Sequence, residues 1–371
     1  MKTTRTTFFT RDKKFYKTFF RLMLVVALQN LVAYSVNMLD NIMLGSYSQN
    51  ALSGAATVNQ IFFIVNQLAL SIGNALVAIC SQYWGKQETG AIRKMTGVAL
   101  ALSVLIGAIV VTACTCIPEQ LLRIFTTSPE IIAEGKAYLG LLKWTFLLFM
   151  ISNLLIAMLR SVETVKISFV ISVVSLITNG CINYTLIFGH FGFPQLGVSG
   201  AAIGTVVSRV IEMSINIIGG SRNLYLKDAI KMKKVPFDTT KEMLKRGLPL
   251  LCNEILWSIS IALISQSYST RGLVAVAAIN ITTTVTNFFM IVCYAMGNSI
   301  SIVVGQQLGA GEIERAKDYD LKMVFMNFIM CFTLAVVLFN VSIYIPQIYN
   351  TSVEVKNLAT SLLKVAACML P

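Results

Sequence analysis

Residues 22–45 read "LMLVVALQNLVAYSVNMLDNIMLG", an apolar run in which Asp40 is the only charged residue. A helix of about 20 apolar residues crosses the roughly 30 Å hydrocarbon core of a bilayer, so this run predicts a membrane-spanning helix. An ionised carboxylate in hydrocarbon costs several kcal/mol on insertion scales, with roughly 3 as a typical figure. Asp40 therefore needs specific partners, or a function that requires it there.

Similar apolar runs recur along the whole chain. The 371 residues are 56% hydrophobic and 13% charged, with a mean hydropathy of +0.72, which leaves too little charge to cover a water-soluble domain of this length. Transmembrane strands alternate strictly over about 10 residues, and these runs do not. The sequence therefore predicts an all-α polytopic membrane protein. The expected spans lie near 18–45, 53–81, 96–117, 138–159, 167–188, 199–219, 247–268, 274–304 and 322–345, and a tenth begins near 357.

The basic residues are distributed unevenly between the loops. Most of the 30 Lys and Arg, which give a net charge of +13, lie in 2–21, 86–94, 160–166, 222–246 and 315–322. These segments precede the first span or follow alternate spans, so the positive-inside rule places them and the N-terminus in the cytoplasm. We expect a multi-pass protein of the plasma membrane, of the bacterial inner-membrane type. The charge then reflects topology and contact with anionic lipids, and no nucleic-acid partner is expected.

The chain aligns with itself when it is shifted by 224 positions. "GNALVAICSQYWGKQE" (73–88) then matches "GNSISIVVGQQLGAGE" (297–312) without a gap. Both copies enter their loop from an even-numbered span, which indicates parallel repeats related by an axis along the membrane normal. We expect an N-terminal lobe over 1–221, a basic cytoplasmic linker over 222–246 and a C-terminal lobe over 247–371.

The second repeat is expected to be incomplete. The first half has six spans, whereas the second has three and part of a fourth, because "LLK" at 362–364 matches "LLK" at 141–143. About 9.5 of 12 transmembrane helices are then present, since two six-helix repeats would total roughly 12. Both a fragment and a C-terminally truncated gene fit the sequence.

Several motifs together resemble the MATE family of multidrug and toxic compound extrusion transporters, of bacterial type. The resemblance covers nearly the whole chain. It rests on the order of "MLDNIMLG" (38–45), "SNLLIAMLRSVETVK" (152–166), "NGCINYTLIFG" (179–189), "LGVSGAAIGT" (196–205) and "GLPLLCNEILW" (247–257). It implies two six-helix lobes, a central cavity, and export of cationic or amphipathic small molecules driven by H⁺ or Na⁺. We expect no cofactor apart from the coupling ion. The expected partners are cationic small-molecule substrates and membrane lipids, and the chain is expected to be a monomer.

Asp40 is the first candidate for an ion-coupling residue. Burial in a low dielectric penalises the ionised form of a carboxyl group, so such a group can take up and release protons. Intramembrane acids that face a bundle interior are functional by default. A structural acid bonded to helix termini or to a lysine is the alternative. The resemblance implies that Asp40 is the ion-coupling acid of the first helix.

Four more polar residues in the first half are candidates for the same site. Asn179 and Asn183 are four residues apart and share one helix face, and Asn153 and Thr205 lie in neighbouring spans. Singly, each is typical of a hydrogen bond between helices, but together they can line a wet pocket around Asp40. Some family members carry a second acid at the position of Asn183. An amide does not titrate, so Asp40 is the one carboxylate expected in this lobe for coupling.

Glu254, in "NEILW", is the analogous acid of the second half. Some family members use a glutamate about one turn further along this helix, so both a substrate-binding and a structural role remain open. Other expected substrate-binding residues are polar or bulky apolar side chains within spans. They are Gln29, Gln60, Gln266, Phe62, Phe63 and Met150.

Three further features favour structural roles. Arg209 and Glu212 have the three-residue spacing of an ion pair within a helix, and a neutralised pair costs less in a membrane than one charge alone. His190 is the only histidine and belongs to no HExxH pattern, so no metal site is expected. The eight cysteines show no CxxC spacing and are interpreted as packing residues.

Other classes of protein compete with this interpretation. A lipid-linked precursor flippase of the same superfamily needs a more cationic cavity to hold pyrophosphate, whereas the embedded charges here include Asp40 and Glu254. A membrane enzyme needs a histidine cluster, paired catalytic acids or a GxSxG motif, which the sequence lacks. An inactive remnant follows if the second lobe leaves polar groups unsatisfied in lipid. The sequence favours a secondary active multidrug antiporter, not an enzyme, and leaves its substrate and coupling ion open.

Overall fold

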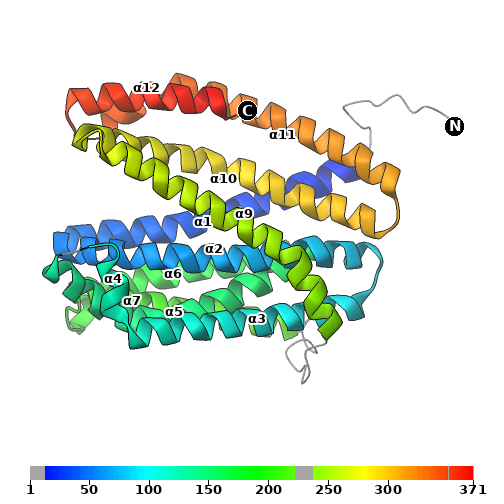
Figure 1. The fold of residues 1–371 in the computed structure, drawn as a ribbon, viewed down its shortest axis with the longest axis horizontal. Coiled ribbons are helices and arrows are strands. Elements are labelled where there is room, and N and C mark those ends of the chain that lie inside the picture. Colours follow the sequence, from blue (N-terminus) through cyan, green and yellow to red (C-terminus); the bar gives the residue numbers. More distant parts are fainter. Residues whose placement is uncertain (1–12, 127, 222–236, 350, 371) are drawn as a thin grey trace. The chain divides into compact units, whose positions relative to one another are not determined.

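A computed structural model describes residues 13–126, 128–221, 237–349 and 351–370 (Figure 1). This described part is helical with short connections and contains no strand, which confirms the all-α prediction. Nine of its helices are long and apolar enough to cross a membrane. They are α1 (Lys13–Tyr47), α2 (Gln49–Gly85), α3 (Thr89–Cys116), α5 (Pro129–Ser161), α6 (Val165–Phe188), α7 (Val198–Ser221), α9 (Phe237–Ser269), α10 (Leu273–Gly309) and α11 (Ile313–Val341).

The shorter elements lie at bends and at the end of the chain. They are α4 (Pro118–Arg123), the 3-10 turns η1 (His190–Gly192) and η2 (Ile345–Ile348), and α12 (Val353–Met369), which contains the tenth predicted run. The ninth span was predicted to reach residue 345, but α11 ends at Val341. Proline lacks the N–H group that a helix needs, and the chain instead turns into η2, where Pro346 occupies the first turn.

Local chemistry explains several helix ends. The Ser48 side chain accepts a hydrogen bond from the Ala51 N–H at the start of α2, and Ser352 does the same for Val355 at the start of α12. Such serine caps satisfy backbone donors that have no partner within the helix. At the end of α6, Gly189 adopts a φ of 73°, a left-handed conformation that glycine reaches without steric cost.

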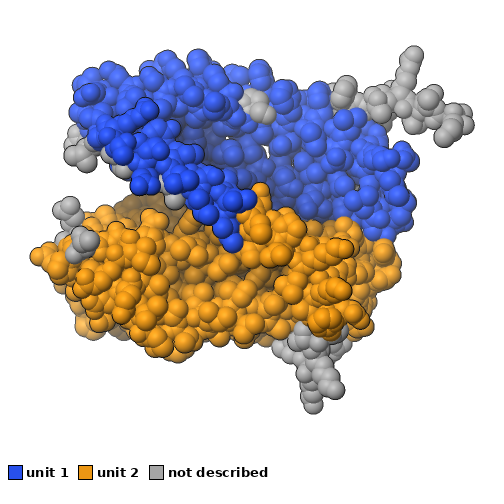
Figure 2. Space-filling model, in the orientation of Figure 1, with its two compact units in different colours: residues 1–27, 255–371 blue, residues 28–254 orange. Residues whose placement is uncertain are grey.

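The chain divides into two compact units, coloured separately in Figure 2. Unit 1 comprises residues 1–27 and 255–371, and unit 2 comprises residues 28–254. The boundaries fall inside α1 and α9, and much of the predicted linker at 222–246 lies outside the described residues. The lobe boundaries inferred from the repeat therefore stay a prediction.

Unit 2 is built around α5. This helix packs against α2, α3 and α7, while α7 also packs along α6. One buried cluster includes Leu139 and Phe146 of α5, and a second includes Leu155 and Met158 near the other end of the same helix. A lobe of this kind is held by close side-chain packing and interhelical hydrogen bonds, because lipid tails are as apolar as leucine.

Unit 1 is a smaller packing of α10, α11 and α12 with the start of α1. Leu338 of α11 and Leu363 of α12 are buried in one cluster, and the rings of Phe15 and Tyr319 lie 4.5 Å apart. The Cys293 and Cys331 sulfur atoms approach to 3.1 Å between α10 and α11, a pairing that sequence spacing alone did not indicate.

Replacing Gly54 is expected to destabilise unit 2. A Cβ atom at Gly54 would lie 2.7 Å from the Glu134 Cβ and 2.9 Å from the Gly135 nitrogen, so α2 and α5 approach closely there. We expect Gly54→Ala to cost about 1–3 kcal/mol by overpacking, measured as a lower melting temperature in detergent. Gly140→Ala is the control, because a Cβ there meets nothing within 4 Å. Equal melting temperatures for both variants would contradict the close approach.

Candidate functional site

A hydrogen-bonded chain of polar side chains holds Asp40 inside unit 2. Asp40 is 8% exposed, and its Oδ1 accepts a hydrogen bond from Asn183 Nδ2 at 2.5 Å. The same Asn183 nitrogen donates to Asn179 Oδ1 at 3.2 Å, and Asn179 Nδ2 donates to Thr205 Oγ1 at 3.4 Å. Helices α1, α6 and α7 thus contribute to one network, which joins four of the residues singled out in the sequence.

Two glycines allow the three helices to come this close. A Cβ atom at Gly204 of α7 would overlap the Asn183 side chain, and one at Gly180 of α6 would lie 3.0 Å from Leu39 Cδ2 of α1. The Asn183 amide therefore lies against the Gly204 backbone on one side and faces Asp40 on the other. Small residues at helix contacts commonly permit such close approach in membranes.

Tyr138 belongs to this site although the sequence gave no signal for it. The side chain extends from α5, is buried, and lies close enough to interact with both Asp40 and Thr205. A tyrosine in an apolar helix is ordinarily a packing residue, so only the fold reveals its place. Asn183 Oδ1 is also buried and has no hydrogen-bond partner within the described residues.

Arg209 and Glu212 form the ion pair predicted from their spacing. Arg209 Nη1 lies 2.6 Å from Glu212 Oε2, and the same oxygen accepts a hydrogen bond from Ser175 Oγ at 3.3 Å. The guanidinium stands 5.0 Å from the centre of the Phe149 ring, a cation–π geometry. Arg209 is also near enough to Asp40 to interact with it electrostatically, so this pair adjoins the candidate site.

Three of the residues expected to bind substrate are instead held in the interior of unit 2. Gln29 is 2% exposed, and its Oε1 accepts a hydrogen bond from Arg160 Nε at 3.2 Å. Met150 is 1% exposed and belongs to the core cluster. Phe62 is half-buried and packs edge-to-face on Phe149, with ring centres 5.0 Å apart. Substrate contact at these positions stays a prediction that needs a rearranged interior.

The remaining candidates lie nearer the surface of their helices. Gln60 and Phe63 of α2 and Gln266 of α9 are exposed, and Asn153 of α5 is half-buried. Glu254 is half-buried and accepts a hydrogen bond from Gln67 Nε2 at 3.0 Å. Glu254 therefore contacts α2, whereas the Asp40 network is formed by α1, α6 and α7.

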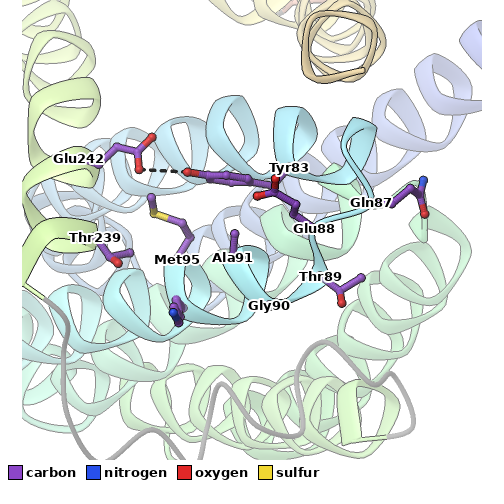
Figure 3. Close-up of a pocket in the computed structure, with 10 residues that line it drawn as sticks. Tyr83, Gln87, Glu88, Thr89, Gly90, Ala91, Met95, Thr239 and Glu242 are labelled. Carbon is purple, nitrogen blue, oxygen red and sulfur yellow. Dashed lines mark hydrogen bonds between the residues drawn. The ribbon is translucent and has the colours of Figure 1, made fainter. Parts of the chain in front are cut away.

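An open pocket lies apart from these residues, at the turn between α2 and α3 beside the start of α9 (Figure 3). Its volume is about 620 Å³, and Tyr83, Glu88, Lys94 and Glu242 contribute to its lining. Tyr83 donates a hydrogen bond to Glu242 at 3.2 Å, and Arg246 pairs with Glu242 at 3.0 Å. These contacts attach α9 to the end of α2, so we interpret the pocket as a feature of that junction.

The candidate site does not resemble a metal centre. Within the described ranges, no three His, Cys, Asp or Glu side chains gather as metal ligands would. His190 instead stacks on the Tyr184 ring with centres 4.5 Å apart. The chemistry available at Asp40 is that of one carboxylate among amides and hydroxyls.

The long apolar helices and the buried Asp40 carboxylate place this chain in a class of proteins, the polytopic membrane proteins with an ionisable site inside the membrane. The family model described as MatE matches residues 26–185 and 249–371. The chain therefore belongs to the MATE family of multidrug efflux transporters, whose members are transporters and not enzymes. The resemblance noted in the sequence is confirmed.

Individual relatives agree with this assignment. The chain is 24% identical over 326 residues to a probable multidrug resistance protein NorM of Thermotoga maritima, covering 87% of this chain and 70% of the relative. It is also 24% identical over 350 residues to the probable multidrug resistance protein YoeA of Bacillus subtilis, covering 93% and 76%. A crystal structure of a MATE protein in a bent conformation superposes with a TM-score of 0.87 at 18% identity, covering 96% of this chain and 79% of that one.

The contact between Asp40 and Asn183 is expected to carry a measurable coupling free energy. A hydrogen bond to a charged group contributes about 1.5–3 kcal/mol. Asp40→Leu, Asn183→Leu and the double variant, unfolded in detergent, should therefore be non-additive by an amount in that range. A second cycle that pairs Asp40→Leu with Asn153→Leu serves as the control and should be additive within about 0.5 kcal/mol. Additivity in both cycles would contradict the contact.

Proposed function

We propose that this chain works as a secondary active antiporter that exports cationic or amphipathic small molecules, with Asp40 as its ion-coupling acid. The observation that carries the proposal is the hydrogen bond of 2.5 Å from Asn183 to the buried Asp40 carboxylate. Short, charge-assisted hydrogen bonds of this kind stabilise an ionised carboxylate. The site therefore suits a group that is used in both its charged and its neutral form.

Asn183 can serve both forms of Asp40. A side-chain amide carries two N–H donors at one end and an acceptor oxygen at the other. Ionised Asp40 accepts from the amide nitrogen, whereas protonated Asp40 has an O–H to donate to the oxygen after the amide turns over. The Asn183 oxygen, which has no other partner among the described residues, is available for that bond.

The donor set supports H⁺ over Na⁺ as the coupling ion. Hard cations are held by several oxygen atoms at once. Here the Asp40 oxygen meets an amide N–H, and the neighbouring Asn179 oxygen already accepts from Asn183. A proton needs only one of these oxygens.

Exchange follows if both ligands act on one conformational equilibrium. Protonated Asp40 is neutral and tolerates a dry lobe, whereas ionised Asp40 favours a wetter lobe and attracts a cationic substrate. A ligand shifts an equilibrium only through its different affinity for the two states. Proton and substrate, by favouring opposite states, would drive each other's release.

Topology and substrate contact belong to the same proposal. The basic loops support a cytoplasmic N-terminus, with the parallel repeats forming two lobes. Exposed Gln60 and Phe63 on α2 offer an amide and an aromatic face to an amphipathic cation.

Other transport functions remain as outcomes of the test. A solved structure of a MOP superfamily transporter from Pyrococcus furiosus, with a TM-score of 0.83 at 17% identity, is described as having a binding pocket of reverse polarity, which suggests a different function for that protein. For this chain the buried Asp40 supports cationic cargo over an anionic lipid-linked precursor.

Asp40→Asn is expected to abolish coupled export. The substituted amide keeps the size and polarity of the side chain but cannot bind and release a proton. Efflux of a fluorescent lipophilic cation from pump-deficient cells should fall to the level of cells without the transporter, at unchanged protein abundance. In proteoliposomes, an imposed pH gradient should drive transport by the unsubstituted chain, and a sodium gradient at constant pH should not.

Glu119→Gln is the matched control, because it neutralises an acid that is paired with Arg123 on α4 and lies outside the Asp40 network. It should retain efflux. Glu254→Gln is measured beside it, because Glu254 is the other embedded acid with a candidate role. Equal efflux from Asp40→Asn and the unsubstituted chain would refute the role of Asp40, and loss only in Glu254→Gln would transfer it to α9. Sodium-driven transport would refute the assignment of H⁺, and transport of an anionic lipid analogue alone would favour the flippase.

A further inference from the structure

The facing sides of α6 and α7 carry polar residues over most of their length. On α6 these are Ser168, Ser175, Asn179 and Asn183, and on α7 they are Thr205, Ser208, Glu212 and Asn216. Their spacings of seven, four and four on α6, and of three, four and four on α7, place each set on one helix face. All are buried except Thr205, which is half-buried. We call these eight residues the polar seam.

Hydrogen bonds show that the two faces meet. Asn179 bonds to Thr205 at one level, and Ser175 bonds to Glu212 further along. As the α6 number falls, the α7 number rises, so the helices run antiparallel. This register places Asn216 near the beginning of α6, where Ser168 lies. The seam therefore extends from the Asp40 network to the end of the helix pair at residues 165 and 221.

The part of the seam beyond Glu212 has unpaired polar groups. Asn216 is 0% exposed, and neither its nitrogen nor its oxygen has a hydrogen-bond partner within the described residues. The Ser168 hydroxyl is equally buried and unpartnered. Elsewhere in unit 2, the Ser152 hydroxyl of α5 and the Gln29 nitrogen of α1 also lack partners among the described residues.

Dry packing does not account for these groups. A buried polar group without a hydrogen bond costs about 1–3 kcal/mol in proteins, and buried polar atoms are normally paired with protein or with ordered water. Most successive seam residues on one helix are about one helical turn apart, roughly 5.4 Å, a separation that one bridging water spans. Ser168 and Ser175 are about two turns apart, so that step needs more than one water. Water bound along the seam would satisfy Asn216 and Ser168 and connect them to Glu212.

We propose that the polar seam is a hydrated proton relay that joins Asp40 to the end of the α6–α7 pair, with Glu212 as its intermediate acid. The proposal rests on the proton coupling proposed above, and it places the relay's outlet on the cytoplasmic side. Asp40 gives up its proton to a neighbouring water, which passes a proton on. The Glu212 carboxylate takes up a proton and releases one toward Asn216, so the relay ends unchanged.

The charged and titratable groups around Glu212 fit a relay. On α7 itself Arg209 holds the Glu212 carboxylate in place. From α5, Tyr138 lies toward Asp40, and Arg160 is bonded to Gln29 of α1. The α6 face contributes uncharged Ser175 at this level. Glu212 is thus the carboxylate between Asp40 and Asn216 along the seam.

The test separates the rate of proton movement from the binding of substrate. Asn216→Leu and Ser168→Val remove the hydrogen-bonding groups beyond Glu212 without touching a charge. We expect each variant to slow the initial rate of pH-driven transport of tetraphenylphosphonium in proteoliposomes by about tenfold or more, equivalent to about 1.4 kcal/mol in barrier. The equilibrium affinity for tetraphenylphosphonium and the midpoint of its pH dependence should stay unchanged, because Asp40 is intact.

Ser214→Leu is the matched control, since this serine is exposed on α7 and its hydroxyl donates to the Val210 carbonyl one turn earlier. It should transport at the unsubstituted rate. Arg209→Gln combined with Glu212→Gln removes both charges together and should also be slow, with a larger solvent deuterium isotope effect. Because this double variant removes both charges of the ion pair together, it leaves no unpaired charge in the interior.

Each outcome has a definite meaning. Unchanged rates in Asn216→Leu and Ser168→Val would overturn the relay. A loss of rate accompanied by an equal loss of affinity, or by a lower melting temperature, would assign the seam to packing and also overturn it. Substrate binding that does not depend on pH in the unsubstituted chain would instead refute proton coupling at Asp40, a failure of the proposed function that this readout shows separately.

Discussion

The hydrogen bond from Asn183 to Asp40 is the contact on which the candidate site of unit 2 depends. A carboxylate among apolar helices is stable only where donors meet it, and the donor here must come from a different helix, α6. That requirement brings α1 against α6 and α6 against α7, which in turn requires bare backbone at Gly180 and Gly204. The helix packing and the chemistry of the site are therefore one arrangement. Side-chain size at two glycines decides whether the acid can be accommodated.

The other charges of unit 2 are arranged so that Asp40 remains the responsive group. Arg209 is neutralised by Glu212 at 2.6 Å and covered by the Phe149 ring, so the pair adds a dipole near the site without adding net charge. Arg160 is bonded to the neutral amide of Gln29. A change in the protonation of Asp40 thus alters the net charge of this interior by one unit, and neighbouring groups do not have to change theirs. Such a change can shift a conformational equilibrium because the surrounding dielectric is low.

The sequence predicted the helices well because hydrocarbon imposes a length and a composition on each span. It located their ends less well. Helix α9 begins at Phe237, well before the predicted 247, since its first turns are polar and apolarity reports only the part within the membrane. The grouping of Asn179 and Asn183 followed from helical periodicity. The sequence could not predict the surroundings of Tyr138, Gln29 and Met150. Whether such side chains face a polar network, a cavity or a core depends on which helices pack against them.

The polar seam also shows how periodicity becomes informative only when two helices are considered together. On α6 alone, serines and asparagines at helical spacing are typical of interhelical hydrogen bonds. On α7 alone, Glu212 is explained by its ion pair with Arg209, and Asn216 is a single amide with no evident role. When the two helices face each other, they carry more hydrogen-bonding groups than they can pair with one another. Ser175 bonds to Glu212, but the side chains of Asn216 and Ser168 have no partner among the described residues. Dry packing favours polar groups that bond to each other, whereas a path for water requires donors and acceptors that have no protein partner. The unpaired groups lie beyond Glu212, on the side away from Asp40. A buried coupling acid needs a connection to solvent, and these groups lie where that connection would run.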